Sequence, residues 1–312
     1  ARLPVRNPQY DWTKLLLGNK SILKLTNHHP YEDLPKILNP KSGYLFNTNN
    51  SPYNATYLTE NLKETNYSET FNFREKENNR SLRFIELIKN YDKINYEDFL
   101  KIKYDQKYPD SLIYDYFDLN EVFYLDKEKY PKIKETIRLI QEWNREGDIN
   151  NIGAAQWSIY FKFIHDVLRE NNFERNDTIK EEFYLKAIEK TQKYIKKHFG
   201  DINIRLGDFQ RHIRGNIDLP VSGLIDMIAP IEVEDYKKGR VRSVSGESYI
   251  MLVKYSKQKI EIETILPYGN SNNPKSKHYT DQMKMYLNKS RKKMTLNKKE
   301  IYKNAIQIYN PK

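Results

Sequence analysis

The chain has 312 residues, of which 38% are hydrophobic and 13% aromatic, so it can bury a substantial core in one large or two ordinary domains. It contains no cysteine, which excludes disulfide bonds, thiolate catalysis and cysteine-ligated zinc. Its formal net charge of +11 makes nucleic acid or another anionic surface a partner to consider, but no zinc-finger, RNP-type or helix-turn-helix pattern predicts base recognition.

The sequence contains no pattern typical of a histidine metal site or of a membrane-spanning helix. The six histidines include no His-x-x-x-His pair, and no apolar run approaches the roughly 18 residues of a transmembrane helix. Two basic runs, Tyr236–Arg242 and Lys289–Lys293, are typical of solvated faces or loops. We therefore expect no membrane partner, no histidine metal site and no nucleic acid partner.

The stretch from Asn39 to Pro52 carries the clearest chemical signal. Asn39-Pro40 and Gly43 are turn formers, Tyr44-Leu45-Phe46 predicts a short buried strand, and Asn47–Pro52 is an amide-rich loop. The predicted strand would bring several carboxamides to one point. Two interpretations are open from the residues alone. The asparagines support turns and left-handed backbone, or one carboxamide NH₂ is held as a donor toward a developing oxyanion.

A polar, irregular segment follows, and then helical periodicity begins. Residues Tyr53–Asn78 predict a surface loop that borders a cleft. From Arg80 to Ile88 the apolar residues recur on one helical face, with Asn79 as the expected N-cap. This puts Arg80 beside the positive end of the helix dipole, which is unfavourable for a cation unless a partner lies close. An exposed or ion-paired arginine and an active-site arginine both fit.

Further apolar stripes at helical spacing extend to residue 200. The expected helices are one capped by Asn95 with Phe99 and Ile102 inside, one from Pro131 to near Gly147, one around Trp157–Leu168, and one around Phe183–Phe199 closed by Gly200. Together they predict a helical lobe at 80–200.

The last third of the chain changes to strand-like patterns. Residues Tyr249–Tyr255 and Lys259–Leu266 predict two strands joined by a hairpin across Ser256-Lys257-Gln258. Helices are expected at 279–288 and 297–309. The sequence therefore predicts an α+β fold in three parts: 1–79, an extended segment with the asparagine strand and loop; 80–200, the helical lobe; and 201–312, a strand-rich segment that closes with two helices.

Several stretches share their residues with one known family. They are Asn39-Pro40, Ser42-Gly43-Tyr44 and Asn47–Pro52; Asn79–Ile85; Leu206–Gly215 with Leu219-Pro220 and Gly246–Tyr249; and Tyr268–Ser271 with His278–Tyr286. These stretches resemble the penicillin acylase (penicillin amidase) family of N-terminal-nucleophile hydrolases, and the third group resembles its acyl-homoserine-lactone acylase branch. The resemblance extends from Leu3-Pro4 to the last expected helix.

The resemblance implies a fold and a set of site residues. The chain would form the C-terminal part of the β chain of an αββα sandwich, together with a helical lobe. The oxyanion-hole asparagine of the family corresponds to Asn49, and its active-site arginine, which would position or polarise the site, corresponds to Arg80. No cofactor is implied. Some family members hold a structural calcium, and Glu60 lies near one of its carboxylates, although the local pattern departs from theirs.

The family nucleophile is a serine at the free N-terminus of the β chain, whose own α-amino group is the base. This chain begins with Ala1, and its residues Arg2–Val5 and Tyr10-Asp11-Trp12 resemble a segment well inside that β chain. An internal serine has no free α-amino group to activate it. We therefore expect a C-terminal fragment that is inactive alone.

The expected parent cleaves the amide bond of a small N-acylated amine, and the resemblance implies that it is periplasmic or secreted. The expected partners of this chain are the N-terminal half of the β chain and the α chain of the same precursor. The alternative is a noncatalytic binding module that uses the acylase scaffold and a basic surface to bind an anionic partner.

Overall fold

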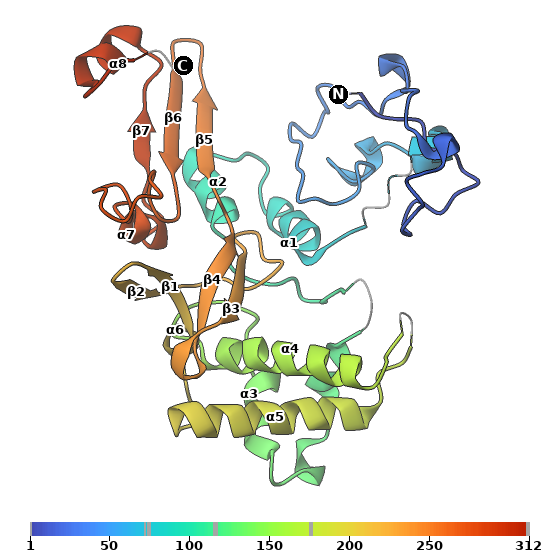
Figure 1. Cartoon of the computed structure of the whole chain (residues 1–312), viewed down its shortest axis with the longest axis vertical. Helices are drawn as coiled ribbons and strands as arrows, with labels where there is room; N and C mark the ends of the chain where they lie inside the picture. The colour runs from blue at the N-terminus through green and yellow to red at the C-terminus, as the bar shows by residue number, and fades with distance from the viewer. Residues whose placement is uncertain (1, 72, 74–75, 115–117, 175–176, 310–312) are drawn as a thin grey trace. The chain divides into compact units, whose positions relative to one another are not determined.

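A computed structural model describes the chain except residues 1, 72, 74–75, 115–117, 175–176 and 310–312. The chain divides into two compact units, Ala1–Ile85 and Glu86–Lys312, called unit 1 and unit 2 below, and the boundary lies inside helix α1 (Asn79–Ile88). Helices and strands are both present (Figure 1), which confirms the predicted α+β class. The finer division into 1–79, 80–200 and 201–312 stays a prediction. No helix among the described residues is long and apolar enough to cross a membrane.

Unit 1 is built mainly from loops and single helical turns. Its short 3-10 helices are η1 (Ser21–Leu23), η2 (Tyr31–Asp33), η3 (Leu58–Glu60), η4 (Glu64–Asn66) and η5 (Glu69–Phe71). Phe71 is 2% exposed, and its ring centroid lies 4.1 Å from that of His29 and 5.7 Å from that of Phe73. These aromatic side chains form a small buried cluster in a unit that has little regular secondary structure.

The buried strand predicted at Tyr44-Leu45-Phe46 does not form. Among the described residues, this segment makes one backbone–backbone hydrogen bond, from Phe46 N–H to the Ala55 carbonyl at 2.9 Å, and the Tyr44 carbonyl accepts from the Thr56 hydroxyl at 2.8 Å. Leu45 is 55% exposed. Three residues between turn formers are too few to make the repeated ladder of a sheet, so the prediction of a buried strand was wrong.

Unit 2 contains a helical layer of α3 (Lys134–Gln141), α4 (Ile152–Glu170), α5 (Glu181–Phe199) and α6 (Leu206–Phe209), with the 3-10 turns η6 (Asn120–Tyr124) and η7 (Lys127–Lys129). Helix α2 (Tyr96–Lys103) lies apart from this layer, and its Tyr96 and Leu100 pack on the three-stranded sheet described below. Helices α4 and α5 pack along each other (Figure 1). Trp157, Ile164 and Ile188 are at most 1% exposed at this contact. The two long apolar stripes predicted for this region are therefore confirmed, and Gly200, with φ of 80°, ends α5 as expected.

Three helix boundaries differ from the prediction. The cap of α1 is Asn78, whose Oδ1 accepts from Ser81 N–H at 2.9 Å, one residue before the expected Asn79. Helix α3 is shorter than expected at both ends, because residues 131–133 form a turn and the helix ends at Gln141. Asn95 caps α2 as predicted, but Phe99 is 42% exposed and not inside.

A four-stranded sheet packs against the helical layer. Its strands β1 (Gln210–Arg214), β2 (Ile217–Pro220), β3 (Ile231–Asp235) and β4 (Val241–Gly246) lie in the order β2-β1-β4-β3. The β1–β4 pair is parallel and the other two pairs are antiparallel. The strand predictions did not include this sheet. A further 3-10 turn, η8 (Lys237–Gly239), joins β3 to β4.

A three-stranded antiparallel sheet contains β5 (Ile250–Tyr255), β6 (Ile260–Ile265) and β7 (Lys292–Met294). The β5–β6 hairpin confirms the predicted pair, and its turn closes with a bond from Ser256 N–H to the Lys259 carbonyl at 3.0 Å. Helices α7 (Met283–Leu287) and α8 (Lys298–Asn304) form where helices were expected, but each is shorter than predicted.

Candidate active site

Asn49 and Arg80, 31 residues apart in the chain, are joined by a direct hydrogen bond in unit 1. The Nη1 atom of Arg80, in the first turn of α1, donates to Asn49 Oδ1 at 3.0 Å. A guanidinium has only donors, so the atom of Asn49 that it contacts must be the carbonyl oxygen. The carboxamide NH₂ is therefore the group left to meet another molecule. Within the described part of the chain this NH₂ makes no hydrogen bond.

The loop backbone at Asn49 has an uncommon conformation. Its φ is +63°, in the left-handed region that asparagine tolerates better than most residues. The Asn49 N–H donates to Oδ1 of Asn47 at 3.0 Å, so the preceding asparagine stabilises the turn. The consequence is that the Asn49 side chain stays exposed.

Asn50 and Asn78 fix the other side of the loop. Asn50 is 3% exposed; its Oδ1 accepts from Thr48 N–H at 3.0 Å and its Nδ2 donates to the Asn54 carbonyl at 2.6 Å. The Nδ2 of Asn78 donates to the Thr48 carbonyl at 2.8 Å. Asn47 and Asn50 therefore stabilise the turns of the loop, which is the first of the two interpretations open from the sequence. The carboxamide of Asn49 points outward, and its oxygen accepts from Arg80.

Aromatic packing places the loop against α1. The rings of Phe46 and Phe84 are stacked with centroids 4.4 Å apart, and Tyr44 lies edge-on to Phe84 at 5.9 Å. The aromatic run therefore packs on helix α1 instead of entering a sheet. Because Phe84 and Arg80 are one helical turn apart, this packing also holds Arg80 near Asn49.

The electrostatics of the pair suit an anion. The guanidinium charge and the N-terminal end of α1 are both positive, and the charged hydrogen bond on the carboxamide oxygen polarises the group toward donation from its NH₂. A negative charge that forms within reach of Asn49 Nδ2 would be stabilised. The arrangement therefore offers one fixed donor supported by a nearby cation.

Glu60, the calcium candidate, is engaged by the backbone of the turn at Pro40–Gly43. Its Oε1 accepts from Lys41 N–H at 2.5 Å and its Oε2 from Ser42 N–H at 2.8 Å. Hydrogen bonds from Ser42 hold the pKa of Glu60 below its ordinary value. The described residues contain no cluster of three metal-ligating side chains. Glu60 thus clamps the turn that leads into the asparagine loop, and its calcium role stays a prediction.

The C-terminal block that carried part of the resemblance has a structural role in unit 2. Gln282 Oε1 accepts from Leu266 N–H at 3.1 Å, and its backbone N–H donates to the Tyr268 carbonyl at 3.0 Å. His278 Nδ1 lies 2.7 Å from a carboxylate oxygen of Asp281. These contacts fix the chain that follows β6.

A buried histidine in unit 2 was not singled out from the sequence. His212 is 1% exposed, with Nδ1 2.7 Å from Ser243 Oγ and Nε2 2.7 Å from the Pro267 carbonyl. The carbonyl can only accept, so Nε2 carries the proton and Nδ1 accepts from the serine. Burial lowers the pKa of His212. No hydrophobic alternation marked it in the sequence, because the two buried positions of β1, Gln210 and His212, are both polar.

Comparisons with known proteins give a consistent result. The family model described as penicillin amidase matches residues 1–303. Among solved structures, a thermostable penicillin G acylase from Alcaligenes faecalis is similar, with a TM-score of 0.53 and 14% sequence identity. The match covers 100% of this chain and 65% of the acylase chain. At that identity the likeness shows the fold alone.

Proposed function

Since the chain belongs to the penicillin amidase family, whose model matches residues 1–303, we propose that it supplies the oxyanion-binding side of an active site that hydrolyses an amide bond. The observation that carries the proposal is the hydrogen bond from Arg80 to Asn49 Oδ1. That bond fixes the orientation of the carboxamide and leaves its NH₂ as the donor.

In the proposed reaction a nucleophile attacks the carbonyl carbon of the substrate amide, and the carbonyl oxygen becomes negatively charged. Asn49 Nδ2 donates a hydrogen bond to that oxygen. Arg80 holds the carboxamide in place and adds positive potential. The same donor serves again when water attacks the acyl-enzyme, because that step forms an oxyanion at the same position.

We propose that the nucleophile is an N-terminal serine on another segment of the same precursor, with the rest of the β chain and the α chain as partners. The chain spans 65% of the acylase that it matches, which is consistent with a larger parent. Tyr255 and Ile260, which pair directly across the β5–β6 hairpin, are 76% and 49% exposed. Such apolar exposure favours a surface where the rest of the protein packs, and the chain alone is expected to be inactive.

The proposed substrate is a small N-acylated amine, and the motifs at Leu206–Gly215 and Gly246–Tyr249 favour an acyl-homoserine lactone as the model compound. We propose a periplasmic or secreted location for the parent. These parts of the proposal rest on sequence resemblance to the family.

The test is the Asn49→Asp variant in the enzyme assembled from all of its chains. Aspartate keeps the shape and an acceptor for Arg80 but has no NH₂. Loss of one oxyanion donor costs about 2.7–4 kcal/mol of transition-state stabilisation, so kcat should fall about 100- to 1,000-fold while the melting temperature is kept. Asn66→Asp, at an exposed position of η4 in unit 1, carries the same change in charge and is the activity control. Turnover unchanged in Asn49→Asp would refute the assignment.

The alternative, a noncatalytic module for an anionic partner, is favoured by one observation. From residue 250 to the C-terminus the chain has 14 lysines and arginines against four acidic residues, so most of the net charge lies there. Binding of a polyanion by this segment would weaken steeply as salt rises. Salt-sensitive binding together with unaffected turnover in Asn49→Asp would favour this alternative over the amidase.

A further inference from the structure

Residues 292–309, called segment 292–309 below, are the part of unit 2 that packs least on the rest of the chain. They contain strand β7 and helix α8 (Figure 1), and every one of them is exposed. Strand β7 is held at the edge of its sheet by pairing with β6. Helix α8 has seven residues and buries none of them, and so short a helix is marginal by itself in water. This favours a contact with a surface outside the described part of the chain.

Apolar side chains lie all along the segment. Ile301 and Tyr302 are adjacent in α8, and Lys298 Nζ lies 5.7 Å from the ring centroid of Tyr302, so a cation and an aromatic ring share one side of the helix. Such a collection of exposed apolar groups marks an interaction site more often than it marks ordinary surface. The apolar side chains of the segment that are at least 40% exposed are Met294, Leu296, Ile301, Tyr302, Ile306, Ile308 and Tyr309.

The segment is also strongly basic. It contains five lysines and one acidic residue, Glu300, so its formal charge is five minus one, or +4. The lysines are at positions 292, 293, 298, 299 and 303. None of them forms an ion pair within the described part of the chain, where the ion pairs of residues 250–309 are Lys259–Glu261, His278–Asp281 and Arg291–Glu263.

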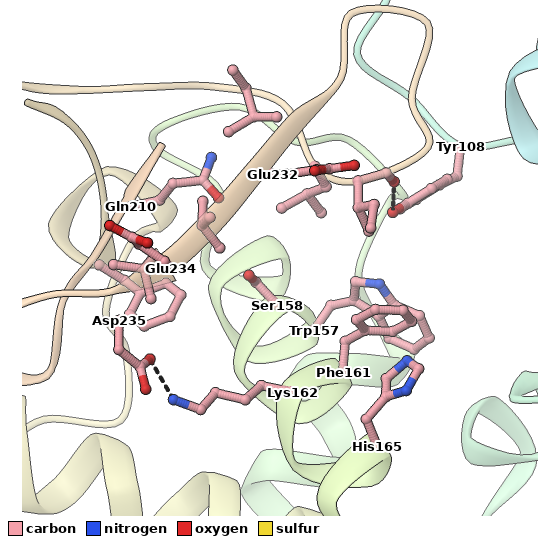
Figure 2. A pocket seen from close by; sticks show the side chains of 16 residues that line it. Tyr108, Trp157, Ser158, Phe161, Lys162, His165, Gln210, Glu232, Glu234 and Asp235 are labelled. Atoms are coloured by element: carbon pink, nitrogen blue, oxygen red, sulfur yellow. Dashed lines mark hydrogen bonds and ion pairs between the residues drawn. The ribbon is translucent and has the colours of Figure 1, made fainter. Parts of the chain in front are cut away.

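Cations elsewhere on unit 2 are balanced locally. At a cavity between α4 and β3, the ammonium of Lys162 is paired with Asp235 (Figure 2). Close by, Arg242 donates to Glu234 at 2.6 Å. The lysines of segment 292–309 have no such carboxylate among the described residues, so charge complementarity favours an anionic partner.

The mixture of lysine and apolar side chains selects the kind of anionic partner. A nucleic acid would contact the lysines but would leave Leu296 and the isoleucines in water. A protein that buried these apolar side chains would also have to desolvate the lysines between them, which is costly. The surface of an anionic bilayer accepts both, because apolar side chains enter the boundary between headgroups and acyl chains while lysines extend to the lipid phosphates.

We propose that segment 292–309 binds the surface of a lipid bilayer that contains anionic lipids. Leu296, Ile301 and Tyr302 enter the interface, and the lysines contact the headgroups. The segment lies on the bilayer and does not cross it, which agrees with the lack of a spanning helix among the described residues. The expectation of no membrane partner rested on the absence of a spanning segment, and a peripheral contact needs none. The proposal is independent of the amidase site, whose residues belong to unit 1.

The experiment is co-sedimentation of the full 312-residue chain with vesicles of phosphatidylcholine alone and of equal parts phosphatidylcholine and phosphatidylglycerol. We expect binding to the mixed vesicles to be about tenfold tighter or more, and to weaken as salt rises. Equal binding to the two vesicles, or no binding to the mixed ones, would overturn the proposal. Binding of duplex DNA without binding of vesicles would identify a polyanion as the partner instead.

The same measurement on the enzyme assembled from all of its chains tests whether the segment is free in the complete protein. We expect the assembled enzyme to bind the mixed vesicles as the single chain does. Binding by the single chain and none by the assembled enzyme would mean that the other chains cover the segment, and would refute the proposal. Neither readout depends on amidase turnover.

A pair of lysine variants locates the charged contact. The double variant Lys298→Gln/Lys299→Gln should weaken binding to mixed vesicles about fivefold per lysine, or about 25-fold. The double variant Lys193→Gln/Lys197→Gln, at exposed positions of α5, loses the same charge and should bind like the parent chain. Equal affinities for the two double variants would refute the site.

A pair of tyrosine variants tests the apolar contact. Tyr302→Ser should weaken vesicle binding about fivefold, because less apolar surface enters the interface. Tyr124→Ser, at a 79% exposed position of η6, is the control and should bind like the parent chain. Both residues are exposed, so both variants should fold. If Tyr302→Ser binds vesicles as tightly as Tyr124→Ser does, the attraction is one of charge alone and the proposed insertion is wrong.

Discussion

The asparagine loop of unit 1 (residues 47–50) and the α4–α5 contact of unit 2 are held together by different forces. In the loop, side-chain hydrogen bonds made by Asn47 as acceptor, Asn78 as donor and Asn50 as both define the backbone, and the side chain of Asn49 is exposed. In the helical contact, Trp157 and Ile164 are at most 1% exposed, so packing defines the structure. Substitutions in the loop should therefore change the position of the Asn49 carboxamide, whereas substitutions in the α4–α5 core should lower the free energy of unfolding.

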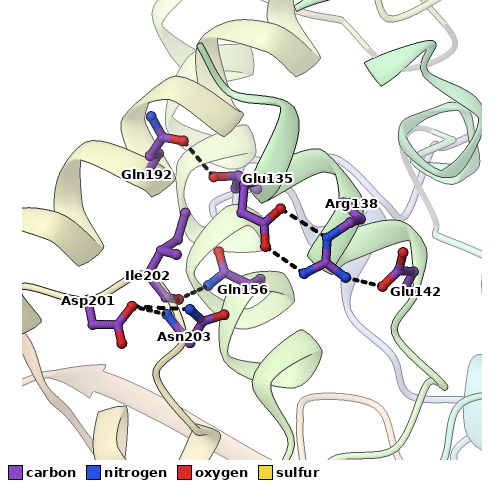
Figure 3. A network of polar contacts seen from close by, with 9 residues as sticks. Glu135, Arg138, Glu142, Gln156, Gln192, Asp201, Ile202 and Asn203 are labelled. Carbon is purple, nitrogen blue, oxygen red and sulfur yellow. Dashed lines mark hydrogen bonds and ion pairs between the residues drawn. The ribbon is translucent and has the colours of Figure 1, made fainter. Parts of the chain in front are cut away.

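Unit 2 also contains polar contacts, but they accompany packing and do not replace it. Gln156 Nε2 donates to the Ile202 carbonyl at 2.7 Å (Figure 3). Gln192 Oε1 accepts from the hydroxyl of Thr136 at 3.0 Å. These bonds join α4 and α5 to neighbours that already share buried apolar surface. The exposed carboxamide of Asn49 is thus placed by a few hydrogen bonds, whereas the buried contacts of unit 2 depend on packing.

The strongest test of this contrast is Ile164→Ala. Ile164 is 0% exposed in α4, so the truncation should lower the free energy of unfolding of unit 2 by about 2–5 kcal/mol. Leu45→Ala, at a 55% exposed position beside the asparagine loop, should cost less than about 1 kcal/mol. Urea denaturation followed by tryptophan fluorescence measures both, since Trp143 and Trp157 lie in the core of unit 2 and Trp12, whose Nε1 donates to the Asn7 carbonyl, lies in unit 1. Equal losses would show that packing controls both regions.

Buried His212 gives a pH-dependent test within unit 2. Its pKa is lowered from 6.5 by burial, so on acidification the unfolded chain takes up a proton before the native protein does. Stability should therefore fall as pH drops below 6.5, by about 1.4 kcal/mol per pH unit until the lower folded pKa is reached. Urea midpoints between pH 5 and 8 measure the slope.

The His212→Gln variant should flatten that pH dependence, even if it lowers stability at every pH. His28→Gln, which removes an exposed histidine of unit 1, is the control for losing a histidine. An unchanged slope in His212→Gln would assign the acid sensitivity to other groups.

The same contrast explains how much of the fold the sequence could predict. Helices α4 and α5 were predicted because the apolar residues of a long segment recur with the helical period and so indicate its buried face. The β5–β6 hairpin was predicted because its two strands are adjacent in the sequence and its second strand alternates apolar and polar residues. The sheet of β1 to β4 was not, because its strands have four to six residues and its central β1–β4 pair is parallel and nonlocal. At Tyr44-Leu45-Phe46 the apolar pattern was real, but a pattern does not say whether its partner is a strand or, as here, Phe84 of a helix.

For the candidate site, the sequence could indicate which residues to consider but not how they are arranged in space. Asn49 and Arg80 were singled out by resemblance to a family. The residues alone could not distinguish Asn49 from Asn47 and Asn50, since the distinction depends on one positive φ angle and on Asn78 about 30 residues away. Nor could they show that Glu60 closes a turn 18 residues earlier.

A smaller effect is expected when the support of the donor is removed but the donor is kept. Arg80→Gln loses the charged hydrogen bond to Asn49 Oδ1, so kcat of the assembled enzyme should fall about tenfold, which is about 1.4 kcal/mol. Lys89→Gln, at an exposed position just after the same helix, is the control for the loss of a positive charge. In an Asn49→Asp background the Arg80→Gln change should add little, because no donor remains to be oriented. Fully additive losses would mean that Arg80 acts independently of Asn49.

The smallest effect concerns Glu60, which clamps the turn before the loop. Its folded-state pKa lies below 4.5 because of hydrogen bonds from Ser42, so the clamp is at full strength above about pH 4.5 and is lost as pH falls through the lower folded value. Glu60→Gln keeps one acceptor and sets an NH₂ against the other backbone N–H, so hydrogen exchange at Lys41 or Ser42 should quicken at neutral pH while the melting temperature hardly changes. Glu64→Gln, an exposed neighbour, should leave both amides protected. If both amides stay protected in Glu60→Gln, the positive φ angles at Asn39 and Gly43 are sufficient to hold the turn, and the asparagine loop does not depend on this carboxylate.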